Sequence, residues 1–148
     1  MATCIHVYSE VRQGNEWEAT EKDTYNEEKP NRFGWVNASM KRVPCPEKYP
    51  FYGLLLDGAR ASWPWSFHQR GMPEDVSEEI RAVCDSFGFE GYGHSHLTLK
   101  ELVEKYLELM VSGQEAKELM VYLRQLIDSL AHIAENHNDV RIVFWFDN

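Results

Sequence analysis

The sequence contains no apolar run as long as the roughly eighteen residues that a membrane-spanning helix needs. Its first residues, MATCIHVYSEV, lack a basic segment followed by an apolar one, so we expect no secretory signal peptide. Cysteine is scarce too, with only Cys4, Cys45 and Cys84 and no Cys-x-x-Cys pair. Such an odd, widely spaced set argues against a disulfide scaffold or a zinc ribbon. These absences favour a reduced cytoplasmic protein that contacts no membrane.

Short catalytic motifs are also missing. The chain has no Gly-x-Ser-x-Gly nucleophile motif, no P-loop and no His-Glu-x-x-His zinc motif. Basic residues are outnumbered, since 15 Lys and Arg stand against 24 Asp and Glu and give a net charge of −9. A general nucleic-acid binder needs a basic face. We therefore expect no extended nucleic acid as a partner.

The negative charge is unevenly distributed along the chain. Residues 75–148 carry 6 basic and 14 acidic residues, whereas residues 1–74 carry 9 and 10. Within the first half, residues 32–72 contain only two acidic residues but six cations: Arg32, Lys41, Arg42, Lys48, Arg60 and Arg70. The chain is therefore an acidic protein with a basic segment in its middle.

Alternating residues predict strands at both ends of the chain. At the N-terminus the apolar face would be Ile5, Val7 and Val11, and Gly14 predicts a hairpin turn into a second strand over residues 16–20. At the C-terminus the apolar face would be Val140, Ile142, Phe144 and Phe146. We expect the two terminal strands to pair, because the last is too apolar for an edge. Their other face would then collect His6, Tyr8, Glu10, Arg141, Trp145 and Asp147.

Capping signals predict the helices. A short helix is expected after Pro50, ending at Gly58. Ser77, two glutamates in the first turn and Gly88 indicate a second helix, whose apolar stripe is Ile80, Val83, Cys84 and Phe87. Thr98 and Glu101 form a capping box for a third, which runs to about residue 111. A fourth helix over about 114–135 has one leucine-rich face: Leu119, Leu123, Leu126, Leu130 and Ile133.

This order predicts a single α+β domain over residues 1–148, long enough to bury a core. We expect a loop-rich segment over about 21–75 with one short strand at FGWVNA, a helical region over about 76–136, and a terminal strand over 140–147. The small, mainly antiparallel sheet would include both terminal strands. An antiparallel helical hairpin and a shorter helix would cover one of its faces.

His94 and His96 stand two residues apart, just before the predicted helix at Thr98. In an extended segment both rings would point the same way, and such a pair can bind a metal or an anion near a helix N-terminus. A metal would need further ligands, for which the pairing of the terminal strands offers Cys4, His6, Glu10 and Asp147. The simpler interpretation is a pair of half-exposed loop histidines that hydrogen-bond to the backbone.

The middle of the chain is rich in aromatic residues. Residues 32–72 hold 8 of the 19 aromatics beside the six cations, and residues 60–70 alone supply Arg60, Trp63, Trp65, His68 and Arg70. Flat rings stack on bases, and guanidinium groups pair with phosphates. A small nucleotide is a better match than a long polyanion, which the acidic remainder would repel. Alternatively, these aromatics form a second hydrophobic cluster under a long loop.

Five segments resemble a family of small, mostly uncharacterised proteins of phages and prophages: CIHVYSE (4–10), FYGLLLDGAR (51–60), RGMPEDVSEE (70–79), GHSHLTLKEL (93–102) and VRIVFWFDN (140–148). The chain departs from the family pattern at Cys4, where the family has Asp, and in lacking Ser-Trp after His96. The resemblance implies a phage-type origin and a host cytoplasm. It implies no activity, but marks these positions as suspects: His6, Arg60, Arg70, Gly71, His94, Ser95 and Asp147.

The leading hypothesis is a binding protein for an anionic, ring-bearing small molecule such as a nucleotide, which would sequester a host defence signal. The ligand would lie between residues 60–71 and the histidine segment 93–96. Arg60 and Arg70 would neutralise phosphate, Trp63 or Trp65 would stack, His68 would lie beside them, and His94 or His96 would donate hydrogen bonds.

Two alternatives come from other classes. One is a metal-assisted phosphodiesterase or nucleotide hydrolase, in which His6, His94, His96 and Asp147 would hold a divalent metal. The other is an acidic protein that inhibits a host nucleic-acid-handling or defence protein by occupying its basic surface. Self-association into a homo-oligomer is compatible with each of the three.

Overall fold

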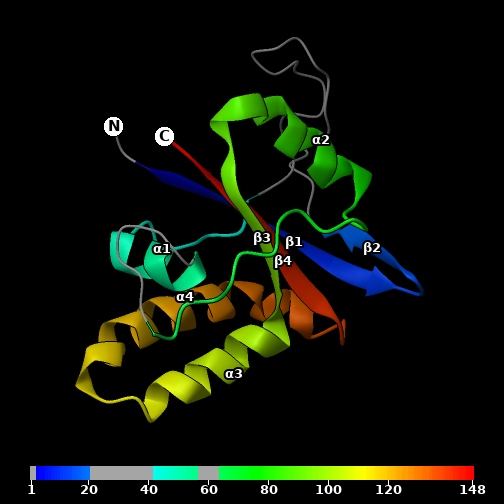
Figure 1. Ribbon diagram of the computed structural model, residues 1–148. Helices are drawn as coiled ribbons and strands as arrows, with labels where there is room; N and C mark the ends of the chain where they lie inside the picture. Colours follow the sequence, from blue (N-terminus) through cyan, green and yellow to red (C-terminus); the bar gives the residue numbers. More distant parts are fainter. Residues whose placement is uncertain (1–2, 21–41, 57–63) are drawn as a thin grey trace.

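The computed structural model describes residues 3–20, 42–56 and 64–148 (Figure 1). Within these residues four strands form one antiparallel sheet in the order β2-β1-β4-β3: β1 (Cys4–Gln13), β2 (Glu16–Ala19), β3 (Tyr92–Thr98) and β4 (Val140–Asp147). The helices are α1 (Tyr49–Leu55), α2 (Glu78–Phe87), α3 (Leu99–Met110) and α4 (Lys117–Ala134), with single 3₁₀ turns η2 (Gly88–Glu90) and η3 (Gln114–Ala116). The predicted α+β class is confirmed.

The two terminal strands lie side by side in the centre of the sheet, as predicted. Their register pairs His6 with Trp145 and Glu10 with Arg141. Because side chains alternate between the faces of a strand, this register separates an apolar face from a face that carries the polar residues. A shift of one residue would exchange the two faces.

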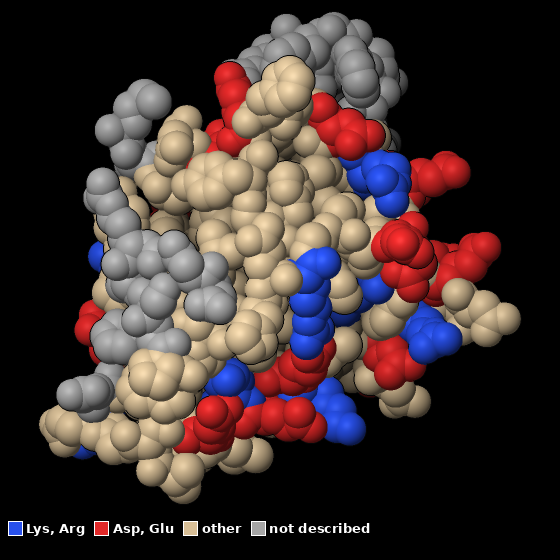
Figure 2. Space-filling model, in the orientation of Figure 1, with Lys and Arg blue, Asp and Glu red and all other residues tan. Residues whose placement is uncertain are grey.

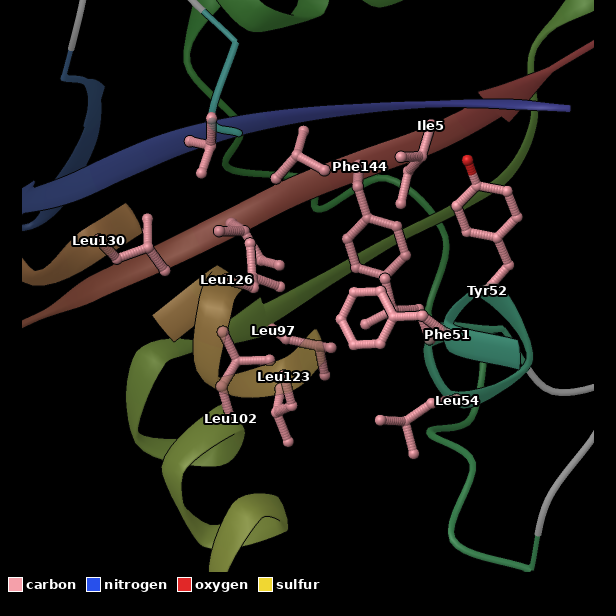
Figure 3. Packing of buried hydrophobic residues seen from close by; sticks show 14 of the residues in the cluster. Ile5, Phe51, Tyr52, Leu54, Leu97, Leu102, Leu123, Leu126, Leu130 and Phe144 are labelled. Atoms are coloured by element: carbon pink, nitrogen blue, oxygen red, sulfur yellow. The ribbon is translucent and has the colours of Figure 1, made fainter. Parts of the chain in front are cut away.

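One face packs against α1 and the hairpin of α3 and α4, which Figure 1 shows together below the sheet. Figure 3 shows Phe51 of α1 beside Phe144 of β4, and it shows Leu54 of α1 with Leu123 and Leu126 of α4 in the same cluster. The leucine face predicted for α4 is buried throughout. Each such side chain contributes about 1.5–3 kcal/mol by leaving water, so this cluster is the main core.

The other face is covered by α2, and we call it the α2 face. Ile80 and Cys84 of α2 pack there against Tyr8, Val143 and Trp145 of the sheet. Cys84 is buried in this cluster, as its place in the apolar stripe predicts, and burial raises the pKa of its thiol to about 11. The sheet is therefore sandwiched between the helical hairpin and α2.

The predicted capping is present at the start of α3 but differs at the start of α2. Thr98 and Glu101 form the predicted capping box at the start of α3. Ser77 occupies the N-cap position of α2, but its side chain makes no capping hydrogen bond. Its backbone N–H donates instead to Glu10 Oε2 at 2.7 Å, so Ser77 joins the start of α2 to the sheet.

Strand β3 was not expected within the predicted helical region. Tyr92–Thr98 pairs with β4, and its register shifts between Tyr92 and Ser95. Gly93, at φ 66°, occupies that irregular stretch and interrupts the alternation that would mark a strand. The two histidines therefore lie in an edge strand and not in a loop.

The remaining predictions differ in small ways or lie outside the described residues. Helix α1 begins at Tyr49 and ends at Leu55, while the expected stop at Gly58 and the strand at FGWVNA are not described. Helix α4 begins three residues later than expected, because a 3₁₀ turn precedes it. None of the helices in the described ranges is long and apolar enough to cross a membrane.

Candidate functional site

Three rings form a row across the α2 face at one end of the sheet. Trp145 lies between His6 and His94, with ring centroids 6.0 Å and 6.2 Å away, and both pairs are stacked. Phe87 of α2 covers the row, its ring 4.5 Å from that of His6 and 5.6 Å from that of Trp145. The strand register places His6 and Trp145 opposite each other, so this row follows from the pairing of the terminal strands.

His6 and Asp147 are brought together, with His6 Nε2 2.8 Å from Asp147 Oδ1. His6 is buried, and burial lowers its pKa more than the hydrogen bond to Asp147 raises it. Its Nδ1 and the indole Nε1 of Trp145 are buried and have no hydrogen-bond partner within the described part of the chain. A neutral His6 that donates to Asp147 keeps an acceptor at Nδ1.

A buried ionic network lies at the other end of the same face. Arg141 Nε donates to Glu10 Oε1 at 2.7 Å, and its Nη1 donates to Asp75 Oδ1 at 2.9 Å. Glu10 is 0% exposed and also accepts from the backbone of Ser77. The guanidinium carbon lies 4.2 Å from the ring centroid of Trp17 in β2. This network joins β1, β2, β4 and the segment before α2.

Residues 70 and 71 are attached to the outer edge of β3. The N–H of Gly71 donates to the carbonyl of His94 at 2.9 Å, and the N–H of Arg70 donates to Ser95 Oγ at 3.1 Å. The guanidinium of Arg70 pairs with both carboxylate oxygens of Glu101, which lowers the pKa of Glu101 to about 2. The charge of Arg70 is therefore already compensated within the protein.

The residues suspected from the resemblance meet in pairs on and beside β3 and the terminal strands. His6 contacts Asp147, Gly71 contacts His94, and the backbone of Arg70 contacts Ser95. Arg60 lies outside the described residues. These contacts give the motifs a structural role, since they join three distant segments of the chain.

Of the described residues of the predicted nucleotide site, Arg70, His94 and His96 lie together at β3, where Arg70 Nη1 donates to the carbonyl of His96 at 3.2 Å, and the others lie elsewhere. Trp65 and Phe67 pack on the main core, on the side of the sheet opposite His94, and His68 is exposed. Trp63 lies outside the described residues. Burial lowers the pKa of both His94 and His96. For the described aromatics of the middle segment, the structure favours the hydrophobic-cluster interpretation.

No group of three or more His, Cys, Asp or Glu side chains in residues 3–20, 42–56 and 64–148 is placed to hold a metal ion. His6 and Asp147 are adjacent, whereas His94 is separated from His6 by the ring of Trp145.

An open groove lies between β2 and the start of α2, beside the Arg141 network. Its volume is about 580 Å³, and five carboxylate residues line it: Glu16, Glu18, Asp75, Glu78 and Glu79. The half-buried Trp17, the buried Ser77 and the exposed Asn15 are also in its lining. Figure 2 shows acidic side chains gathered, among a few basic ones, on the side where Figure 1 places β2 and the start of α2. We call this feature the acidic groove.

Most of the groove residues were not predicted as a site. Glu78 and Glu79 were attributed to the helix start, and Trp17 to a strand of the hairpin. The available signal was the alternation in Glu16-Trp17-Glu18, which places Trp17 on the same face as its register neighbours of β1. The packing of α2 against that face depends on contacts between distant segments, which no local pattern contains.

The three lowered histidine pKa values make stability depend on pH. His6, His94 and His96 each have a folded-state pKa below the ordinary value of 6.5, with burial as the first cause. As the pH falls below about 6.5 the unfolded chain therefore takes up protons first, so the free energy of unfolding decreases. We expect the urea midpoint to fall between about pH 7.5 and pH 5.5.

In the variant His94→Gln, the urea midpoint should depend less on pH, because one of the three histidines is removed. The shift of Glu101, from 4.5 to about 2, acts below this pH window and so does not interfere. A midpoint that is constant or rises towards pH 5.5 would contradict the assignment of these histidines as neutral in the folded state.

Comparisons of the chain with family models, with curated proteins and with solved structures give no match.

Proposed function

We propose that the protein binds a basic segment of a partner protein in the acidic groove. The observation that carries this proposal is the lining of the groove, which among the described residues holds Trp17 and five carboxylate residues and no lysine or arginine. Beside the groove, Arg141 is paired with Glu10 and Asp75, and Arg12, the register partner of Trp17, donates to the carbonyl of Gly14. A positively charged side chain entering the groove would therefore meet more carboxylates than Arg141 pairs with.

The start of α2 would by itself oppose a cation, because a helix N-terminus carries a partial positive charge of about half a unit. Glu78 and Glu79 in the first turn, together with Asp75, exceed this partial charge. The net charge of −9 adds a long-range attraction for basic partners, which speeds association and weakens with salt. Both effects favour a basic protein surface as the ligand.

This proposal is a more specific form of the hypothesis that the chain is an acidic inhibitor of a host protein. It assigns the contact to β2 and the start of α2 instead of the acidic helices in general. The nucleotide hypothesis is less favoured, because Glu101 already compensates the one described cation on which it relied, Arg70. On the resemblance to phage proteins, the partner would be a host protein whose basic surface is occupied.

The test is the binding of a fluorescein-labelled peptide of Gly-Arg repeats, followed by fluorescence anisotropy. The double variant Asp75→Asn and Glu78→Gln removes two groove charges on the side of α2. We expect it to weaken binding about tenfold, which corresponds to about 1.4 kcal/mol. Affinity should also fall between about 0.01 M and 0.15 M salt, where the screening length decreases from about 30 Å to 8 Å.

The matched control is Glu104→Gln with Glu135→Gln, which removes the same charge from exposed positions on α3 and at the end of α4. We expect this control to change the affinity less than about twofold. Equal losses in the two double variants would mean that net charge alone attracts the peptide, and would overturn the groove as the site.

A further inference from the structure

We propose that the outward face of α3 binds a second copy of this chain, with the two α3 helices antiparallel. The face, which we call the α3 stripe, consists of Val103, Leu107 and Met110 and of Val111 at the C-cap. These residues are 40%, 56%, 56% and 86% exposed, and they make up four of the eight exposed large hydrophobic residues in the described part of the chain. Helix α3 lies on the side of the sheet opposite α2 (Figure 1), so this inference does not depend on the acidic groove.

The stripe is continuous because its spacing follows the helical period. Val103, Leu107 and Met110 stand at positions i, i+4 and i+7, which share one face of a helix. Leu102 and Leu109 lie on another face and are buried in the main core. Helix α3 thus carries apolar side chains on two faces, and the second face is exposed. Contiguous exposed apolar residues with a polar border are typical of a protein–protein contact.

A row of charged residues borders the stripe, and its order indicates the partner. Lys100, Glu104 and Glu108 follow one another at intervals of four residues. Each stands three residues before a member of the stripe, so the two rows are neighbours on the helix surface. Their side chains are 85%, 61% and 50% exposed. The row begins with a cation and ends with a carboxylate, so it is complementary to a copy of itself turned end to end.

The mixed charge of this row disfavours a partner with charge of one sign. A basic segment would meet Lys100, and an acidic segment would meet Glu104 and Glu108. Within the chain, Lys100 Nζ lies 4.0 Å from Glu104 Oε1, and Lys105 Nζ lies 2.9 Å from Glu108 Oε2. Exposed pairs of this kind are weak, so Lys100 and Glu108 can also pair with a second copy.

The antiparallel arrangement follows from a two-fold axis near residue 105. Such an axis places the same border of both helices on the same side of the contact, and every contact occurs twice. With a rise of about 1.5 Å per residue, Val103 lies level with Leu107 of the second copy. Lys100 then lies within about 3 Å, measured along the helix axis, of Glu108 in the second copy. A parallel pair would instead put lysine level with lysine.

The first experiment is sedimentation equilibrium of the intact chain at concentrations up to about 1 mM, which detects even weak association. About 0.15 M salt shortens the screening length to about 8 Å and limits the repulsion between two chains of net charge −9. We expect a monomer–dimer equilibrium. Leu107→Gln should raise the dissociation constant at least about tenfold, because the lost apolar contact occurs twice. The matched control, Phe89→Gln, changes a fully exposed side chain in η2 and should alter the constant less than about twofold.

An exchange of charges tests the antiparallel arrangement. Lys100→Glu should weaken the dimer about fivefold, because carboxylates would then meet carboxylates across the contact. The double variant Lys100→Glu with Glu108→Lys restores opposite charges there, and its dissociation constant should return to within about twofold of the wild-type value. Thermal unfolding checks that each variant remains folded.

A chain that stays monomeric at about 1 mM would overturn the proposal. Equal weakening by Leu107→Gln and Phe89→Gln would mean that association does not use the α3 stripe, and would overturn it as well. A charge exchange that fails to restore the dimer would contradict the antiparallel second copy. The peptide titration of the acidic groove does not depend on these results, so the proposed function is tested separately.

Discussion

Replacing Arg141 with leucine should lower the free energy of unfolding by about 3–5 kcal/mol, because the change leaves the buried carboxylate of Glu10 without its cation. Glu10 is 0% exposed and would lose the guanidinium that it accepts from at 2.7 Å. Asp75 would lose its donor as well. Urea unfolding measured at neutral pH reports the difference directly.

Two further variants distinguish the effect of this buried network from that of an exposed ion pair. Arg124→Leu removes an exposed arginine that pairs with Asp128 on α4, and should change the urea midpoint very little. The double change Glu10→Met and Arg141→Leu removes both buried charges and should recover much of the loss. A single Arg141→Leu variant as stable as Arg124→Leu would mean that the network contributes nothing to the fold.

The second large effect is expected at Gly93. A Cβ on this residue would lie 2.8 Å from Cδ2 of Leu56 and 2.9 Å from Cδ2 of Phe146, at a φ of +66°. Phe146 is 1% exposed, so it has little space into which to move. Gly93→Ala should cost about 2–5 kcal/mol, the sum of backbone strain and overpacking.

Gly88 provides the matched control for this substitution. Its φ is +56°, but an added Cβ would meet nothing within 4 Å. Gly88→Ala therefore carries only the cost of backbone strain at φ 56° and ψ −128°, about 1–3 kcal/mol. If the two alanine variants unfold at the same urea concentration, the close approach of β3 to Leu56 and Phe146 does not constrain the structure.

Much of the fold follows from local patterns in the chain. The alternation in the terminal segments fixed which residues face the helices, and the register of β1 with β4 confirms both faces. The capping box at Thr98 and the leucine face of α4 are also as predicted. These features depend on neighbours in sequence or on a period of two or 3.6 residues, so one sequence is sufficient to find them.

Strand β3 and the place of α2 could not be predicted in this way. The glycines on either side of Tyr92 interrupt the alternating pattern that would indicate a strand. The strand forms because it pairs with β4. Helix α2 has a clear apolar stripe, but nothing local indicates which face of the sheet it covers. The face that α2 covers is decided by the contacts of Ile80 and Cys84 with Val143 and Trp145, which lie far away in the chain.

The candidate site was predicted only in part. The polar face of the terminal strands collects His6, Glu10, Arg141 and Asp147 as expected, and it pairs them into two separate networks. The acidic groove depends on β2 and the residues before α2 meeting beside Arg141. Carboxylates that the sequence explains as helix capping line a common groove only once these segments meet.

The most direct test of the proposed site is a ¹H–¹⁵N correlation spectrum recorded while the unlabelled Gly-Arg peptide is added. The proposed function predicts shifts confined to the indole N–H of Trp17 and to the backbone amides of residues 15–19 and 75–79. Shifts spread over α3 and α4 would indicate attraction to acidic helices in general and would contradict the groove. An unchanged spectrum at saturating peptide would contradict the binding of basic segments altogether.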